Sequence, residues 1–330
     1  VILTHEPATT NLPPTDARIV CLDRDWAELI EPQPETNPPS LGHSKHSCYI
    51  LFTSGSTGMP KGILVGHESW RNMEVAHAEF GVHDPDDHLL QFASLSFSIS
   101  LFGTFMSWLA GSTLYQVTDE QGMPGEPLFK LLREAKISKV SWPVSLLATL
   151  PPDNLPDLTT VISTAEPCTE EVVERWRQGG RRFLNLYGNS EVSLGSTFYE
   201  WYEGAPFTIG KSLPNTKMYL LDTELQQVPI GVTGEICTSG IGLARGYVDR
   251  PEATAEKFIP NPFSGIPGDR LYRTGDLGRY LPNGEIEFIG REDFQVSLRG
   301  FRIELTEVET VIREHEQVQE CAVATKADPQ

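Results

Sequence analysis

The chain has 330 residues, a formal net charge of −19, 39% hydrophobic and 22% charged residues, a composition typical of globular proteins with two or more domains. The acidic balance argues against nucleic acid or an anionic membrane as the main partner, although a local site can still bind a small anion. No apolar stretch is long enough for a membrane-spanning helix, and residues 1–20 lack the pattern of a signal peptide.

The first residues and the cysteines indicate origin and compartment. The chain begins on an apolar run without an initiator methionine, from which we expect a fragment or a processed piece. The five cysteines are scattered, odd in number and without metal-ligand spacing, at positions Cys21, Cys48, Cys168, Cys237 and Cys321. We therefore expect mostly buried, inert thiols in a reducing cytoplasm.

Strand-like and helix-like segments alternate after residues 31–46, which are rich in proline and polar residues and predict a loop. The predicted strands are 48–53, 139–144, 158–164 and 182–188. The predicted helices are 67–80, 100–110, 127–137 and 169–179, the last of them capped by Thr169. This alternation predicts an α/β fold in which parallel strands are buried between helices.

From about residue 205 the pattern changes to short strands with Gly, Asn and Pro turns, predicted at 217–222, 234–240 and 278–291. The Pro-Asn-Gly run at 282–284 favours a hairpin. A helix at 305–318 and a strand at 319–326 then indicate the start of a small α+β subdomain. The sequence thus predicts an α/β layer followed by a β-rich layer and the opening of a further unit.

The stretch LFTSGSTGMPKGILVGH, residues 51–67, gathers glycines and hydroxyl side chains just before Lys61. Such a loop between a strand and a helix offers backbone N–H groups and hydroxyls to a polyphosphate, and a lysine adds positive charge. The P-loop pattern is not met, because Pro60 precedes Lys61 and Gly62 follows it. An ordinary glycine- and serine-rich turn is the alternative interpretation. A Rossmann site is excluded, because no G-x-G-x-x-G follows a strand at the start of a helix.

This stretch resembles the phosphate-binding signature of the adenylate-forming superfamily, and four later segments resemble further motifs of that family in the same order. They are NLYGNSE (185–191), GEICTSGIGLARGYVDRPEATAEKF (234–258), LYRTGDLGRY (271–280) and IEFIGREDFQVSLRGFRIELTEVE (286–309). Their form resembles the adenylation domains of nonribosomal peptide synthetases more than acyl-CoA synthetases or luciferases. The resemblance implies an adenylation core over residues 1–292 that lacks the family's first motifs, and a hinge with an incomplete C-terminal subdomain over 293–330.

The activity implied by the resemblance is that of a ligase. It would activate a carboxylic acid with ATP as an acyl-adenylate and transfer the acyl group to the phosphopantetheine thiol of a carrier protein. Positive charge, Mg²⁺ and enforced proximity must overcome the repulsion between the carboxylate and the α-phosphate. The implied cofactors are therefore ATP and Mg²⁺.

The resemblance also assigns roles to residues, each of which has a plain structural role when taken singly. Glu191 would bind Mg²⁺, and Arg291 would reach ribose or phosphate. Asp276 would accept the ribose hydroxyls, and Tyr187 would stack on adenine with Asn185 nearby. The phosphates would lie against Lys61, Thr53, Ser54, Gly55, Ser56, Thr57, Gly58 and Ser190. Ser190 and Asn189 replace the Thr and Pro of the family motif.

The expected acid substrate depends on Ser98 in the stretch LSFSISLFG. In family members that select α-amino acids, an Asp at this position pairs with the substrate ammonium, which is costly to bury unpaired. The other implied pocket residues include no acid and are Ile99, Phe102, Ser145, Ile162, Thr164, Leu186, Leu194 and Gly195. We therefore expect an acid without an α-ammonium, such as an α-keto, α-hydroxy, aryl or fatty acid. An amino-acid-selecting domain with another anchor for the amine is the alternative.

Asp293 matches the hinge of the family, between its core and its small domain. The family's adenylating lysine lies in a P-x-x-x-x-G-K segment, and no such segment follows residue 293, because Lys326 stands in another context. We therefore expect the chain by itself to bind ATP and the acid but to adenylate poorly. Alternatives are an acyl- or aryl-CoA ligase and a non-catalytic binding module. Further expected partners are other synthetase modules or a small helper protein.

Overall fold

The computed structural model describes residues 1–54, 60–81, 84–118, 120–193, 195–293, 295–298, 301–313, 315 and 317–325. The chain divides into two compact units, Val1–His43 and Ser44–Gln330. Within the described ranges, every helix is too short or too polar to cross a lipid bilayer. The boundary expected at residue 293 stays a prediction.

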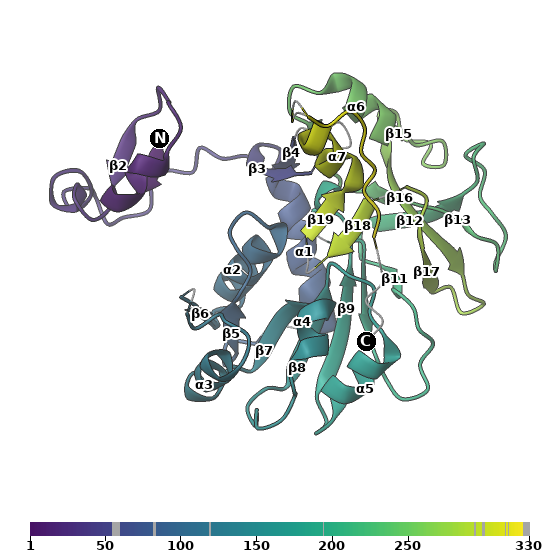
Figure 1. Cartoon of the computed structure of the whole chain (residues 1–330), viewed down its shortest axis with the longest axis horizontal. Coiled ribbons are helices and arrows are strands. Elements are labelled where there is room, and N and C mark those ends of the chain that lie inside the picture. The colour runs from purple at the N-terminus through teal and green to yellow at the C-terminus, as the bar shows by residue number, and fades with distance from the viewer. Residues whose placement is uncertain are drawn as a thin grey trace. The chain divides into compact units, whose positions relative to one another are not determined.

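The first unit contains two short parallel strands, β1 (Ile2–Thr4) and β2 (Ile19–Cys21), drawn in purple in Figure 1. A 3-10 helix, η1 (Glu6–Asn11), and a π-helix, η2 (Trp26–Ile30), follow the two strands in turn. Carboxylates fix the turns around them, since Asp25 accepts a hydrogen bond of 2.9 Å from the backbone N–H of Cys21. These elements are too short to produce a clear periodicity, and the sequence did not predict them.

The second unit is built around a seven-stranded sheet with the order β11-β10-β9-β8-β7-β5-β6. Five strands run parallel, namely β5 (His88–Gln91), β6 (Thr113–Gln116), β7 (Lys139–Pro143), β8 (Thr160–Thr164) and β9 (Arg182–Tyr187). Two antiparallel strands, β10 (Thr197–Glu200) and β11 (Lys211–Ser212), complete one edge. Every residue of β8 is buried, as expected of a central parallel strand. The predicted α/β fold is confirmed.

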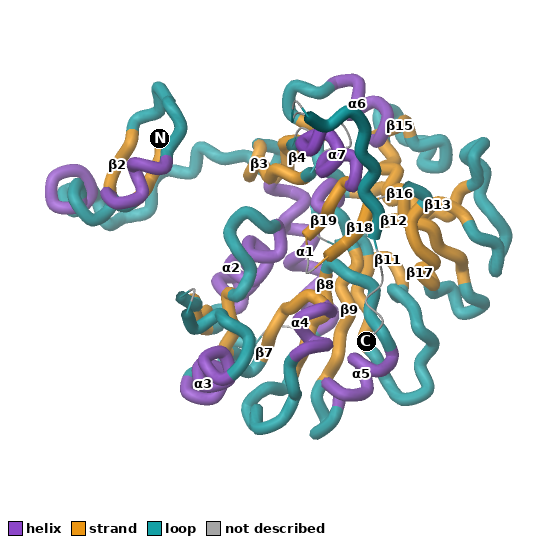
Figure 2. Tube along the Cα trace, in the orientation of Figure 1, coloured by secondary structure: helices purple, strands orange, loops and turns teal. Residues whose placement is uncertain are grey.

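Five helices accompany this sheet and are distinguished from the strands in Figure 2. They are α1 (His67–Phe80), α2 (Ser98–Ala110), α3 (Glu126–Glu134), α4 (Val144–Thr149) and α5 (Glu170–Arg177). The predicted cap is present, because the Thr169 side chain accepts a hydrogen bond from the backbone N–H of Val172. Of these helices, only the short α4 was not predicted.

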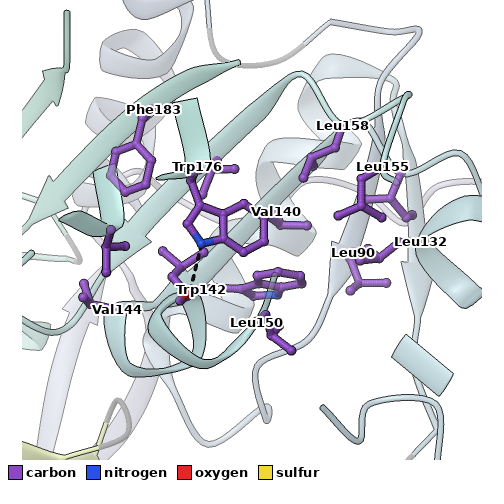
Figure 3. Close-up of a cluster of buried hydrophobic side chains, with 14 of the residues drawn as sticks. Leu90, Leu132, Val140, Trp142, Val144, Leu150, Leu155, Leu158, Trp176 and Phe183 are labelled. Carbon is purple, nitrogen blue, oxygen red and sulfur yellow. Dashed lines mark hydrogen bonds between the residues drawn. The ribbon is translucent and has the colours of Figure 1, made fainter. Parts of the chain in front are cut away.

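A tryptophan pair lies at the centre of the core between α4, α5 and the sheet (Figure 3). The rings of Trp142 and Trp176 meet edge to face with centroids 6.0 Å apart. The indole N–H of Trp176 donates a hydrogen bond of 2.8 Å to the carbonyl of Leu147, so this side chain is both packed and anchored.

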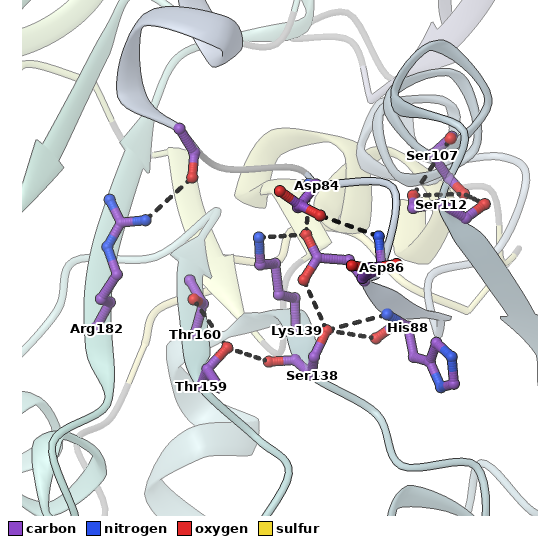
Figure 4. A network of polar contacts seen from close by, with 12 residues as sticks. Asp84, Asp86, His88, Ser107, Ser112, Ser138, Lys139, Thr159, Thr160 and Arg182 are labelled. Atoms are coloured by element: carbon purple, nitrogen blue, oxygen red, sulfur yellow. Dashed lines mark hydrogen bonds and ion pairs between the residues drawn. The ribbon is translucent and has the colours of Figure 1, made fainter.

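A buried polar network joins the amino ends of β5 and β7 (Figure 4). Lys139 forms an ion pair with Asp87, whose other carboxylate oxygen accepts a hydrogen bond of 3.0 Å from Ser138. The Ser138 hydroxyl in turn accepts a hydrogen bond from the backbone N–H of His88. These contacts fix neighbouring strands at the edge of the sheet where the strands begin.

The glycine-rich loop lies in a setting that differs from the prediction. It joins two antiparallel strands, β3 (Ser47–Thr53) and β4 (Lys61–Gly66), and α1 begins only after β4. The β-branched Ile63 and Val65 are fully buried, with the half-buried Leu64 between them, which favours a strand. The expected strand-loop-helix arrangement is therefore wrong. Residues 55–59 of the loop lie outside the described residues.

The predicted β-rich layer is present and forms a five-stranded antiparallel sheet. Its strands are β12 (Thr216–Leu221), β13 (Gly234–Gly240), β15 (Phe258–Pro260), β16 (Arg270–Tyr280) and β17 (Ile286–Arg291). Strand β14 (Gly246–Tyr247) instead pairs with β4, and helix α6 (Pro251–Lys257) follows it. The expected hairpin joins β16 to β17, with Gly284 in the left-handed conformation that this turn requires.

The last described elements are the strand pair β18 (Gln295–Leu298) and β19 (Phe301–Glu304) and helix α7 (Leu305–Arg313). The helix predicted to residue 318 ends at Arg313. The strand predicted at 319–326 is wrong over its described part, because this segment pairs with side chains of α7. The backbone N–H of Val323 donates to Glu309, and Arg313 donates to the carbonyl of Cys321.

Replacing Trp176 by alanine should lower the free energy of unfolding by about 3–5 kcal/mol, because it removes a buried aromatic ring and leaves a cavity. The control is Trp108→Ala on α2, where the side chain is 67% exposed and the expected change is below about 0.5 kcal/mol. Chemical denaturation monitored by circular dichroism measures both. Equal losses for the two variants would contradict this account of the core.

Candidate functional site

A cavity of about 850 Å³ opens where β8 and β9 end. Its wall includes Thr164, the last residue of β8, and the segment 185–190, which leads out of β9. Residues 51–54 of β3 and its following loop, and residues 96–99 at the start of α2, add to the wall. The carboxyl ends of parallel strands are the usual place for a ligand in such sheets.

A cluster of charged and polar groups around Asp276 forms part of the wall. The Asp276 carboxylate is buried, accepts a hydrogen bond of 2.7 Å from the Tyr187 hydroxyl, and forms an ion pair with Arg291 through its other oxygen. The β16–β17 register places Arg291 directly opposite Asp276. The predicted hairpin therefore brings these two charges together.

The protonation of this cluster follows from its surroundings. Burial, reinforced by the negative charge of Asp276, raises the pKa of Tyr187 well above its usual value, so the phenol stays a neutral donor. Burial works against the charge of Asp293, but two hydrogen bonds of 2.7 Å from Arg291 lower the pKa of this carboxyl. Arg291 thus connects a buried and a more exposed carboxylate.

Glu191 and Lys61 meet around a third side chain, Tyr247. Glu191 lies in a short 3-10 turn, η3 (Ser190–Val192), is 2% exposed, and accepts a hydrogen bond of 2.9 Å from the Tyr247 hydroxyl. The Lys61 ammonium lies 5.4 Å from the centre of the Tyr247 ring. Both Lys61 and Glu191 lie outside the cavity wall formed by the described residues.

The cavity brings together most of the other residues singled out in the sequence. Those in its wall are Thr53, Ser54, Ser98, Ile99, Thr164, Asn185, Leu186, Tyr187, Ser190, Asp276, Arg291 and Asp293. The hydroxyls of Ser98 and Ser190 are 3.4 Å apart, so the expected acid pocket and phosphate site meet there. Gly55, Ser56, Thr57, Gly58 and Leu194 lie outside the described residues.

Four expected pocket residues lie behind this wall. Phe102 and Ile162 are buried in the same hydrophobic cluster as Leu186. Gly195 packs beneath Leu186, where an added Cβ would come within 2.9 Å of the Leu186 side chain. Ser145 is held by Glu166, which accepts hydrogen bonds from its backbone N–H and its hydroxyl.

Several wall residues were not identified from the sequence. Glu166 places a carboxylate in the wall, whereas the expected pocket contained no acid. Trp201, Phe207 and Phe288 add aromatic surface, and the Trp201 and Phe207 rings are 4.1 Å apart. Phe288 and, outside the wall, Tyr247 lie in the motif segments 286–309 and 234–258, a signal that could have found them. Trp201 and Phe207 lie in a segment without a recognisable motif.

Comparison with known proteins gives consistent matches. The family described as AMP-binding enzyme matches residues 1–248. Chondramide synthase cmdD of Chondromyces crocatus is 42% identical over 337 residues, which cover 100% of this chain but 9% of that protein. The chain thus spans a small part of this relative's length.

Two solved structures are similar in fold. The adenylation domain AlmE of Vibrio cholerae, in complex with glycyl-adenosine-5'-phosphate, has a TM-score of 0.77 and 26% identity, covering 86% of this chain and 55% of that one. NpsA-ThdA, an artificially fused adenylation-PCP di-domain NRPS from Klebsiella oxytoca, has a TM-score of 0.82 and 26% identity, covering 97% and 65%.

Replacing Asp276 by alanine should lower the free energy of unfolding by about 3 kcal/mol, because it removes a buried carboxylate that Tyr187 and Arg291 share. The matched control is Asp293→Ala, which removes a partner of the same arginine. This side chain is 42% exposed, and the expected loss is below about 1 kcal/mol. Denaturant titration compares them, and a larger loss for Asp293→Ala would refute the assignment.

Proposed function

Because this chain belongs to the family of AMP-binding enzymes, we propose that it binds ATP and a carboxylic acid and joins them as an acyl-adenylate with release of pyrophosphate. The observation that carries the proposal is the single cavity shared by Asp276, Tyr187, Ser190 and Ser98. Asp276 and Tyr187 offer groups suited to a nucleoside, and Ser98, with Ile99 and Leu186 in the same wall, offers an uncharged surface suited to an acid. The AlmE structure, solved with an aminoacyl adenylate, supports the same class of ligand.

Asp276 would hold the ribose through its two acceptor oxygens. It is buried and already oriented by Tyr187 and Arg291, so little reorganisation is needed when a nucleoside binds. Tyr187 would present its ring to adenine, with Asn185 beside the base. Asn185 is itself held by a 3.0 Å hydrogen bond from Ser163 to its side-chain oxygen.

The phosphates would lie against Thr53, Ser54, Ser190 and Lys61, and we extend this assignment to Gly55, Ser56, Thr57 and Gly58. The loop joins two strands, so successive backbone N–H groups rather than a helix N-terminus would bind the anion. Positive charge would come from Lys61, from Arg291 and from a metal.

Glu191 fits the role of a Mg²⁺ ligand. It is a buried, oriented carboxylate, which is a hard oxygen donor. No three His, Cys, Asp or Glu side chains gather into a metal site in the part of the chain that the structure describes. This suits Mg²⁺, which is commonly held by one or two carboxylates together with phosphates and water. When bound, the metal would offset the charge of the phosphates.

The acid would bind against Ser98, Ile99, Thr164 and Leu186. The Ser98 hydroxyl donates to a carbonyl or hydroxyl oxygen but cannot neutralise an ammonium. We therefore propose an α-keto, α-hydroxy or aryl acid as the substrate class. Glu166 favours one alternative, in which the substrate is an amino acid and this carboxylate forms an ion pair with its ammonium.

Transfer to a carrier-protein thiol is the proposed second step. It is supported by the similarity to NpsA-ThdA, whose name describes fused adenylation and PCP domains. Other synthetase modules or a helper protein would be further partners, and coenzyme A would be the acceptor in the alternative ligase class. The five unpaired cysteines suit a reducing cytoplasm, where we place the reaction.

The chain should bind a non-hydrolysable ATP analogue, and Asp276→Asn should weaken binding about tenfold to a hundredfold. The reason is that hydrogen bonds to a charged group contribute about 1.5–3 kcal/mol, and about 1.4 kcal/mol is tenfold. Isothermal titration calorimetry measures both proteins. Glu200→Gln, which removes a carboxylate paired with Arg182 outside the cavity, should leave the affinity unchanged. A wild-type chain that does not bind the ATP analogue would contradict the proposal.

The substrate class is tested with two acyl-sulfamoyl adenosines that differ only in carrying leucine or its α-keto analogue. The keto compound should bind at least about tenfold tighter to the wild type, because an unpaired ammonium is disfavoured in the pocket. Ser98→Asp should reverse this order. Tighter binding of the leucine compound by the wild type, lost in Glu166→Gln, would establish the alternative anchor instead.

A further inference from the structure

We propose that Tyr247 is a positioning residue that arranges the metal ligand Glu191 and the phosphate lysine Lys61 relative to each other. Its hydroxyl would orient the Glu191 carboxylate, and its ring would hold the Lys61 ammonium. One neutral side chain would thus position two of the groups that act on the same phosphates, the carboxylate that holds the metal and the lysine ammonium. This inference rests on the function proposed above.

The geometry joins three segments that are far apart in the sequence. Tyr247 is 7% exposed, and its hydroxyl donates a hydrogen bond of 2.9 Å to Oε1 of Glu191. The Nζ atom of Lys61 lies 5.4 Å from the centre of the Tyr247 ring, within the range of a cation–π contact. The two contacts use different parts of the side chain, so the hydroxyl contact can be removed while the ring contact is kept.

The backbone fixes Tyr247 without any ligand. It lies in β14, directly opposite Ile63 in β4, and its N–H donates a hydrogen bond of 3.0 Å to Thr254. The preceding Gly246 has a φ of 138°, and a Cβ there would lie 2.4 Å from the Thr254 side chain. Glycine is therefore required at this point, and it allows the tyrosine to approach the turn that carries Glu191.

The turn that carries Glu191 is held by the same segment. The backbone N–H of Ala244 donates a hydrogen bond of 2.8 Å to the carbonyl of Glu191. The Ser193 hydroxyl donates a hydrogen bond of 2.8 Å to the carbonyl of Gly242. Main-chain and side-chain contacts from residues 242–247 thus fix both the position of Glu191 and the direction of its carboxylate.

The chemistry of tyrosine suits this role. Its hydroxyl donates one hydrogen bond and adds no positive charge, so it orients the carboxylate and leaves the other oxygen for a metal. Metal-binding carboxylates are generally oriented by such a second residue, and losing that residue typically weakens metal affinity ten- to a hundredfold. A lysine or arginine in the same place would compete with the metal for the carboxylate.

The test is calorimetry of the 330-residue chain with a non-hydrolysable ATP analogue, in a series of Mg²⁺ concentrations and in EDTA. Tyr247→Phe keeps the ring but removes the hydroxyl. It should raise the Mg²⁺ concentration needed for tight binding about tenfold and leave the affinity in EDTA unchanged. Tyr247→Leu also removes the ring under Lys61, so it should weaken binding in EDTA as well.

Two controls make the result specific. Tyr280→Phe removes a tyrosine hydroxyl that donates a hydrogen bond of 2.9 Å to the carbonyl of Met218, away from the cavity wall, and should change neither affinity. In a Glu191→Gln background, Tyr247→Phe should have no further effect on the Mg²⁺ dependence, because the two act through one contact. Circular dichroism of every variant checks that it is folded.

The outcomes separate this inference from the proposed function. A wild-type chain that binds no nucleotide, or binds it without regard to Mg²⁺, would defeat the proposed function. If Mg²⁺ strengthens wild-type binding and Glu191→Gln abolishes that effect, the function stands. A Tyr247→Phe variant with unchanged Mg²⁺ dependence, or with an effect additive to Glu191→Gln, would then overturn the role of Tyr247 alone.

Discussion

Burial of two carboxylates is the constraint on which the site depends, because a charged group removed from water must be given hydrogen-bond donors. Asp276 and Glu191 are 5% and 2% exposed, and each accepts a hydrogen bond from a tyrosine hydroxyl. A tyrosine orients a carboxylate without cancelling its charge. Both acids are therefore acceptors held in fixed directions, which is what a sugar or a hard cation needs.

Strand pairing brings the hydrogen-bond donors to the two buried carboxylates. The β16–β17 hairpin brings Arg291 opposite Asp276, and the pairing of β14 with β4 brings Tyr247 to Glu191. The parallel sheet contributes the carboxyl ends of β8 and β9, from which Thr164 and Tyr187 reach the cavity. Residues from three sheets thus form the site, and no single sheet supplies all of them.

The parts of this arrangement that the sequence could predict are the local ones. Alternating apolar segments predicted β7, β8, β9 and α5, and the Pro-Asn-Gly run predicted the β16–β17 hairpin, because these signals lie within a few residues. The strand after the glycine-rich loop was missed, because Gly62 and Gly66 lie within Lys61–Gly66 and leave only three apolar residues in a row. Glu166 was missed as a site residue because no motif includes it and its partner Ser145 lies 21 residues earlier. Tyr247 stands in a motif segment, but its contact with Glu191 depends on the distant pairing of β14 with β4.

The acidic total charge and an anionic ligand are compatible for an electrostatic reason. At physiological ionic strength, charges on the surface are screened beyond about 8 Å, whereas buried pairs are screened much less. A net charge of −19 therefore repels large polyanions that would contact much of the surface. It repels a small anion within a cavity only weakly. For the proposed anionic ligand, the outcome would depend on Arg291 in the cavity wall, held by Asp276, and on Lys61, held by Tyr247. In the proposed function, the direction of a few groups at the site, rather than the sum over the chain, would decide which anion is bound.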